Sequence, residues 1–240
     1  MELPWKYTSN TFLVQTVGTY KLMNIVLSDH VARLGQTLPG GPDPVIIAQL
    51  SRTQIVKSSW DAAYASWIAA RGIYKGKTLA MTQKLADLSS LKVKQWDIAI
   101  QGSFLEGTPE YTQLLPNGRG PFQSGAYDLR LAEVKALQLR LANFAPLAAL
   151  ATTVGTYYTE MKTLRDAQQS QEGVVDTTSA LTEVQRVAAA VILYKNLGGL
   201  MEKFADNPSR VEDFFDMNYL RDGAATPPED EPAPPVPPVI

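Results

Sequence analysis

The sequence predicts an all-α protein, an antiparallel bundle of about six long helices with short capped helices and an extended, proline-rich C-terminal tail. Three observations predict this fold class. Apolar residues recur every three or four positions through most of residues 11–222, as on the buried face of an amphipathic helix. Cap-then-proline pairs and glycine–proline clusters separate these periodic stretches. In the tail, residues 223–240, the composition changes completely and seven residues are proline.

The first helical stretch follows a short extended N-terminal arm, residues 1–10. Because the apolar pattern reaches back to residues 11–17, we expect that segment to be helical, although it would equally suit a strand. The run Leu-Pro-Gly-Gly-Pro at 38–42 ends this helix. Its apolar face is formed by Tyr20, Met23, Leu27, Val31 and Leu34.

The second helix opens at Asp43-Pro44, where a capping residue precedes proline, and extends to about residue 74. Its stripe is aromatic, with Trp60, Tyr64 and Trp67 at spacings of four and three. We interpret this stripe as a packing face, because a ligand platform would need polar groups converging beside it. Lys75-Gly76-Lys77 predicts a break or a kink, after which a third helix runs over 78–104.

A second series of helices follows a short helix that begins at Thr108-Pro109. The segment Pro-Asn-Gly-Arg-Gly-Pro, 116–121, cannot continue a helix because it holds two prolines and two glycines. Another short helix begins at Asn207-Pro208, with a competing capping-box start at Ser209 and Glu212, and extends to about residue 220. The longer helices between them are expected at about 126–143, 146–170 and 177–204, with an interruption at 171–173.

Two stretches about one hundred residues apart share the same order of signals. In 103–118 and in 203–218 a Phe closes a helical pattern, a cap–proline pair follows, and an apolar doublet comes next. This repeated order leads to the hypothesis of an internal duplication, with halves 11–121 and 122–222 forming one bundle. The alternative is that any chain of linked helices reuses cap–proline signals, and the sequence leaves both open.

The amino-acid composition and the net charge exclude several classes of protein and of functional site. The 240 residues are 45% hydrophobic and 19% charged, which is ordinary for a folded protein. The net charge of −2 argues against a nucleic-acid partner, since phosphate neutralisation needs a clear cationic surplus. The chain has no cysteine, which excludes disulfides, thiolate metal sites and a cysteine nucleophile.

The sequence also bears on location. MELPWKYTSN lacks the apolar core of a classical secretory signal. The longest strongly apolar run, 187–194, is too short for a bilayer, which needs about 20 such residues. We therefore expect no stable membrane span and, by default, a cytoplasmic protein, with export by a non-classical route left open.

Residues suited to catalysis are few. His30 is the single histidine; beside Asp29 it could act as a base, but we expect a surface or hydrogen-bonded helix residue. The carboxylates Glu212, Asp213 and Asp216 fit the solvated face of a short helix. Phosphate-binding GxxxxGK[ST] and nucleophile GxSxG motifs are absent. We expect no enzymatic activity, no cofactor and no metal.

The stretch 52–94 has eight basic and two acidic residues. It is either a solvated helical hairpin or a surface that receives the acidic proline-rich tail of another copy, since prolines lose little entropy on docking and pack against aromatic rings. A patch for anionic lipid or nucleic acid is the rival interpretation. The candidate assembly interface comprises Trp5, Tyr7, Arg71, Lys75, Lys77, Lys84, Glu229, Asp230, Glu231, Pro234, Pro235, Pro237 and Pro238.

Together these features predict a non-enzymatic structural subunit. The bundle would self-associate into an oligomer or filament, with its terminal extensions docking on neighbouring copies, so the expected partner is the chain itself. The alternative is a membrane-active, pore-forming-like bundle that releases its apolar segment 187–201 into lipid. A third hypothesis is a bundle that binds a small ligand or acts as an enzyme.

Overall fold

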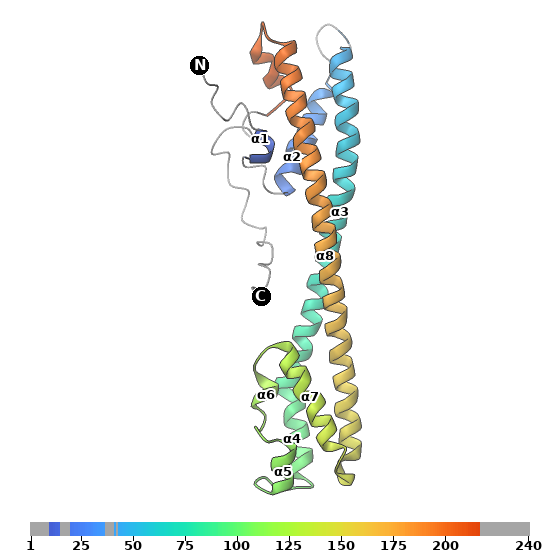
Figure 1. Cartoon of the computed structure of the whole chain (residues 1–240), viewed down its shortest axis with the longest axis vertical. Coiled ribbons are helices and arrows are strands. Elements are labelled where there is room, and N and C mark those ends of the chain that lie inside the picture. The colour runs from blue at the N-terminus through green and yellow to red at the C-terminus, as the bar shows by residue number, and fades with distance from the viewer. Residues whose placement is uncertain (1–9, 15–19, 37–40, 42, 217–240) are drawn as a thin grey trace. The chain divides into compact units, whose positions relative to one another are not determined.

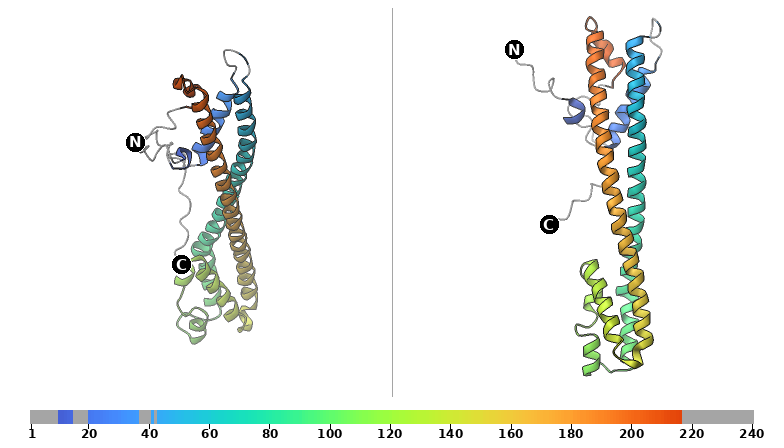
Figure 2. Two further views of the ribbon diagram at one scale, coloured as in Figure 1. Left: turned by 45° about the horizontal axis from the view of Figure 1, so that its top comes forward. Right: turned by 45° about the vertical axis from the view of Figure 1, so that its right-hand side comes forward.

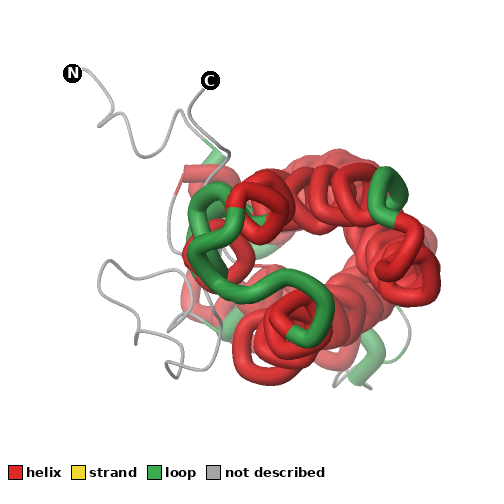
Figure 3. Tube along the Cα trace, turned by 90° about the horizontal axis from the view of Figure 1, so that it is seen from below, coloured by secondary structure: helices red, strands yellow, loops and turns green. Residues whose placement is uncertain are grey.

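The computed structural model describes residues 10–14, 20–36, 41 and 43–216, and the secondary structure of these residues is entirely helical (Figures 1 and 3). The prediction of an all-α helical bundle is confirmed. The expected arm, apart from Asn10, and the proline-rich tail lie outside the described residues. Residues 11–17 were open to a helix or a strand, and the first four of them form helix α1, Thr11–Val14.

Two long helices dominate the chain: α3, Pro44–Asp87, and α8, Ala148–Lys203. The expected interruptions at 75–77 and 171–173 are wrong, because both helices continue through them. Neither position holds a proline, and an interior glycine costs only about 1 kcal/mol. Hydrogen bonds between the two helices outweigh that cost, as Gln171 Nε2 donates to the Ala70 carbonyl at 3.3 Å and Gln168 Nε2 donates to Thr78 Oγ1 at 3.0 Å.

The chain forms two compact units. Unit 1 comprises residues 1–68 and 177–240, and unit 2 comprises residues 69–176. In each unit a segment of α3 lies antiparallel beside a segment of α8 (Figure 2). The boundaries of these units, at residues 68/69 and 176/177, therefore differ from the boundary between the predicted halves 11–121 and 122–222. The internal duplication itself stays a prediction.

Unit 1 is built around the aromatic stripe of α3. Trp60 is fully buried and its Nε1–H donates to Asn24 Oδ1 of α2, Tyr20–Leu34, at 3.0 Å. The Tyr20 ring packs edge-on against Trp60 and Trp67, with centroid distances of 6.0 and 4.8 Å. Asp43 caps α3 as predicted, since its Oδ1 accepts the backbone N–H of Val45 at 2.9 Å.

The expected short helix after Asn207 is instead a six-residue 3-10 turn, η4, Pro208–Asp213. Asn207 caps no backbone N–H; its Oδ1 accepts the Ser209 hydroxyl at 2.7 Å. The side chain of Asn207 therefore bonds to Ser209 and does not cap the turn. Glu212 and Asp213 are exposed, as predicted.

His30 joins three elements of unit 1. Its Nδ1 lies 2.8 Å from the Phe214 carbonyl, which follows η4, and its Nε2 lies 3.0 Å from Asn196 Nδ2 of α8. Asn196 also donates to Thr53 Oγ1 of α3 at 2.7 Å. The imidazole stacks on Phe215 with a centroid distance of 4.0 Å. With the proton on Nδ1, the neutral ring both donates and accepts, so the expectation of a hydrogen-bonded histidine holds in the core.

This histidine makes the stability of unit 1 dependent on pH. Burial lowers the pKa of His30 from 6.5 to about 4, so between these values the unfolded chain binds a proton that the folded chain does not. The contribution of the neutral, buried His30 to the free energy of unfolding is complete above pH 6.5. It falls by about 3 kcal/mol as the pH drops to 4. Urea unfolding at pH 7.5 and 4.5 should show this loss, and the His30→Gln variant should show a smaller one; equal losses would contradict the assignment.

Unit 2 packs shorter helices against the remaining parts of α3 and α8. Thr108 caps α5 as predicted, its Oγ1 accepting the Tyr111 N–H at 3.3 Å. Phe122 is fully buried in the core of this unit. Between the long helices, after the π-helical turn described below, come α4, Val93–Gln101; α5, Pro109–Leu114; α6, Gly120–Gln123; α7, Tyr127–Leu141; and the 3-10 turn η3, Ala145–Leu147.

A π-helical turn, η2, Leu88–Lys92, separates α3 from α4. A π turn interrupts the regular hydrogen-bond ladder of a helix and is frequent at functional sites. Side chains donate to the carbonyls just before it: Tyr157 Oη to the Lys84 carbonyl at 2.7 Å, and the buried Arg130 guanidinium to the Leu85 carbonyl at 2.8 Å. These bonds hold the turn against α7 and α8.

Candidate functional site

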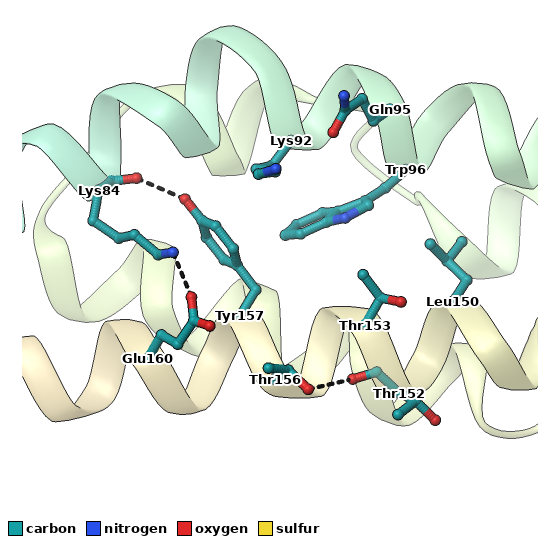
Figure 4. Close-up of a pocket in the computed structure, with 10 residues that line it drawn as sticks. All are labelled: Lys84, Lys92, Gln95, Trp96, Leu150, Thr152, Thr153, Thr156, Tyr157 and Glu160. Atoms are coloured by element: carbon teal, nitrogen blue, oxygen red, sulfur yellow. Dashed lines mark hydrogen bonds and ion pairs between the residues drawn. The ribbon is translucent and has the colours of Figure 1, made fainter.

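A groove of about 580 Å³ lies in unit 2, between the end of α3 with η2 and α4 on one side and the first part of α8 on the other (Figure 4). Its volume is within the range of about 300–1,000 Å³ that is usual for ligand sites. The groove is lined by Lys84, Lys92, Gln95, Trp96, Leu150, Thr152, Thr153, Thr156, Tyr157 and Glu160.

Two aromatic side chains form the floor of the groove. Trp96 of α4 and Tyr157 of α8 meet edge-on with a centroid distance of 5.4 Å, and they are only 3% and 5% exposed. The Tyr157 hydroxyl is held 2.7 Å from the Lys84 carbonyl and 3.1 Å from Asp87 Oδ2. Burial raises the pKa of Tyr157, so this hydroxyl stays protonated and remains a hydrogen-bond donor.

The rim of the groove carries two lysines with different surroundings. The Lys84 ammonium lies 3.9 Å from the centre of the Tyr157 ring and pairs with Glu160 Oε2 at 2.5 Å (Figure 4). Lys92 makes no ion pair or hydrogen bond with any described residue. Its charge is therefore the one on this rim that the described residues leave without a counter-ion.

The groove contains hydrogen-bond donors that have no acceptor among the described residues. The Trp96 indole N–H has no acceptor among the described residues, and it is not one of the fully buried polar atoms that lack a partner, so it is accessible from the groove. The hydroxyls of Thr152, Thr153 and Thr156 donate to carbonyls of their own helix. A free ammonium with a free indole N–H suits a ligand that is anionic and rich in acceptors.

Among the predicted interface residues that the structure describes, only Lys84 lines the groove. Arg71, Lys75 and Lys77 also lie on α3 in unit 2; Lys75 is exposed, Arg71 is half-buried, and Lys77 Nζ donates to Gln171 Oε1 at 3.4 Å. The remaining predicted residues lie outside the described part of the chain: Trp5, Tyr7, Glu229, Asp230, Glu231, Pro234, Pro235, Pro237 and Pro238.

Sequence reasoning missed most of the groove. Lys92 lies within the basic stretch 52–94, and Trp96 lies within the helix expected over 78–104, but neither position marks a groove. Tyr157 and Glu160 carried no signal at all, because their position opposite α4 depends on how helices some sixty residues apart align. The lysine-rich run was the one available signal.

A second candidate feature is an exposed stripe on α8 in unit 1, the α8 stripe. Its members are exposed and alternate at spacings of four and three, and the exposed Lys195 occupies the position between Val191 and Gly198. Exposure reaches 61% at Val184 and 55% at Met201. The stripe comprises Ala180, Val184, Val187, Val191, Gly198 and Met201.

The outward face of α3 in unit 1 resembles the α8 stripe in composition. It exposes small, mostly uncharged residues at the same alternating spacing, where a solvated helix face ordinarily carries charges. This α3 face comprises Ala48, Ser51, Ile55, Ser58, Ala62 and Ala65.

The chain matches no model of a known protein family, no curated protein and no solved structure. Within the described residues, no three His, Cys, Asp or Glu side chains gather as a metal site would require. No described helix combines the length and the apolar content that crossing a bilayer demands.

Proposed function

We propose that this protein is a non-enzymatic helical scaffold that self-associates, with the α8 stripe of one copy packing on the α8 stripe of another. One observation carries this proposal. Across positions 180–201 the exposed residues are apolar except Lys195, which follows Val191 by four positions, while the partly exposed Glu183 pairs with Arg186 beside the stripe. Apolar residues spaced alternately by four and three form the seam of helices that pack together along their length.

A second copy is the occupant that this face fits best. Identical stripes are self-complementary, and a two-fold axis places the same patch on both subunits. From Ala180 to Met201 the stripe extends about 32 Å at the helical rise of 1.5 Å per residue. Its valines are about half exposed in the single chain, so burying each contributes on the order of 1 kcal/mol.

The α3 face supports assembly beyond a pair. Its alanines and serines allow a neighbouring helix to approach closely, and it lies on a different helix from the α8 stripe. A subunit with two separate association faces extends into a larger oligomer or a filament. The α8 stripe makes the first contact in this scheme because its side chains are larger and more apolar.

The proposal is tested by the mass of the full-length protein in solution. Light scattering over a concentration series from about 1 μM to 1 mM should show the mean mass rising with concentration, without lipid, as expected for micromolar-to-millimolar affinity. A constant monomer mass over the whole series would contradict it. Liposome leakage by the same protein in place of assembly would favour the membrane-active alternative.

A further inference from the structure

The groove of unit 2 has unused donors and no assigned ligand. We propose that it binds the acidic, proline-rich segment 222–240 of a neighbouring copy, an inference that rests on the proposed self-association. The groove thereby becomes a second, peptide-type contact between subunits, separate from the α8 stripe. Three properties of the segment match the groove: its backbone chemistry, its charge and its side chains.

The first match is between donors and acceptors. Seven of the residues from 223 to 240 are proline, which has no backbone N–H, so the segment offers mainly carbonyl acceptors. Such sequences favour an extended left-handed helix with no internal hydrogen bonds, which leaves those carbonyls free. The Trp96 indole N–H has no acceptor among the described residues and borders the groove. A peptide carbonyl supplies the missing acceptor.

The second match is electrostatic. The segment holds Asp222, Glu229, Asp230 and Glu231 and no basic residue, whereas residues 69–94 hold six basic residues and one acidic residue. The acidic groups nearest the groove are already engaged, Glu160 with Lys84 and Asp87 with the Tyr157 hydroxyl. Lys92 remains to receive a carboxylate of the segment.

The third match is between ring surfaces. Proline-rich peptides commonly dock in grooves lined by aromatic residues, where the preformed extended helix loses little entropy. Here Trp96 and Tyr157, which are almost fully buried, and the half-buried Leu150 line the apolar bottom of the groove (Figure 4). Pairing through the α8 stripe would make this docking a tethered event, whose effective concentration depends on whether the segment spans the distance to the groove.

The test places a photo-cross-linker in the segment of the full-length chain, as Val236→benzoylphenylalanine. Chains with this substitution and normal isotopes are mixed with ¹⁵N-labelled chains without it, and cross-linked peptides are mapped by mass spectrometry. The expected products join residue 236 of the unlabelled chain to labelled peptides from 84–96 or 150–160. Isotope content separates links between chains from links within one chain.

Two labelled variants make the test specific to the groove. Lys92→Glu should lower the yield of inter-chain links to the groove by about tenfold, because it replaces the free cation by an acid facing acidic residues. Lys94→Glu is the matched control: it makes the same charge change two residues away, at an exposed position outside the groove lining, and should keep the yield within about twofold.

Links confined to one chain, links to other surfaces, or equal losses in both variants would overturn the groove assignment. Light scattering of the same samples distinguishes this failure from failure of the proposed function. If the mass rises with concentration but residue 236 never reaches the groove, self-association stands and the groove assignment is wrong. If the mass stays that of a monomer, the proposed function itself fails.

Discussion

Val187→Glu combined with Val191→Glu is expected to abolish self-association, raising the dissociation constant by about 1,000-fold or more. Each copy would bring two carboxylates into the centre of the α8 stripe, and the two-fold arrangement would set them against the same charges of the partner. Burying unpaired charges costs several kcal/mol even after relaxation. Light scattering across the concentration series measures the effect.

The matched control is Leu129→Glu combined with Leu139→Glu. Both leucines are exposed on α7 in unit 2, by 70% and 57%, so this pair adds the same two charges to another apolar surface. The control should assemble like the unchanged protein, and circular dichroism should show all three proteins equally helical. Assembly of the stripe variant at normal concentrations, or equal loss in the control, would contradict the interface.

Trp60→Ala is expected to lower the free energy of unfolding of unit 1 by about 4 kcal/mol, a large effect for a single substitution. The indole is fully buried, packs against Tyr20 and Tyr64, and donates to Asn24. Its removal leaves a cavity that the surrounding helices cannot fill and deprives the Asn24 carbonyl oxygen of this donor. Urea unfolding followed by circular dichroism measures the loss.

Ile68→Ala is the control for this substitution. Ile68 lies on the same helix but is half exposed, so its replacement should change the free energy of unfolding by about 0.5 kcal/mol or less. A loss below about 1 kcal/mol for Trp60→Ala would mean that the aromatic stripe is not the core of unit 1.

The cap–proline pairs in the sequence correctly predicted where two helices start, because each start depends on a hydrogen bond between residues close together in the chain. Asp43-Pro44 and Thr108-Pro109 each begin a helix because the first side chain reaches a backbone N–H two or three residues later. The core position of Trp60 was predictable for a related reason, since periodicity alone places it on the buried face.

Features that depend on distant contacts were not predictable. Gly76 and Gly173 resemble helix ends, yet α3 and α8 continue through them because hydrogen bonds between the two helices near both points outweigh the cost of a glycine. The groove depends on the alignment of Trp96 with Tyr157, which are far apart in sequence. No local pattern encodes that alignment.

Single-cysteine cross-linking tests the α8 interface most directly, because the chain has no cysteine of its own. Full-length Val184→Cys, Val187→Cys and Val191→Cys variants each carry one thiol in the stripe, and Leu139→Cys carries one outside it. Under mild oxidation, we expect a covalent dimer from at least one stripe variant, since a disulfide forms only where two Cα atoms approach within about 7 Å. If the protein self-associates but no stripe variant exceeds the Leu139→Cys level, the α8 stripe is not the interface.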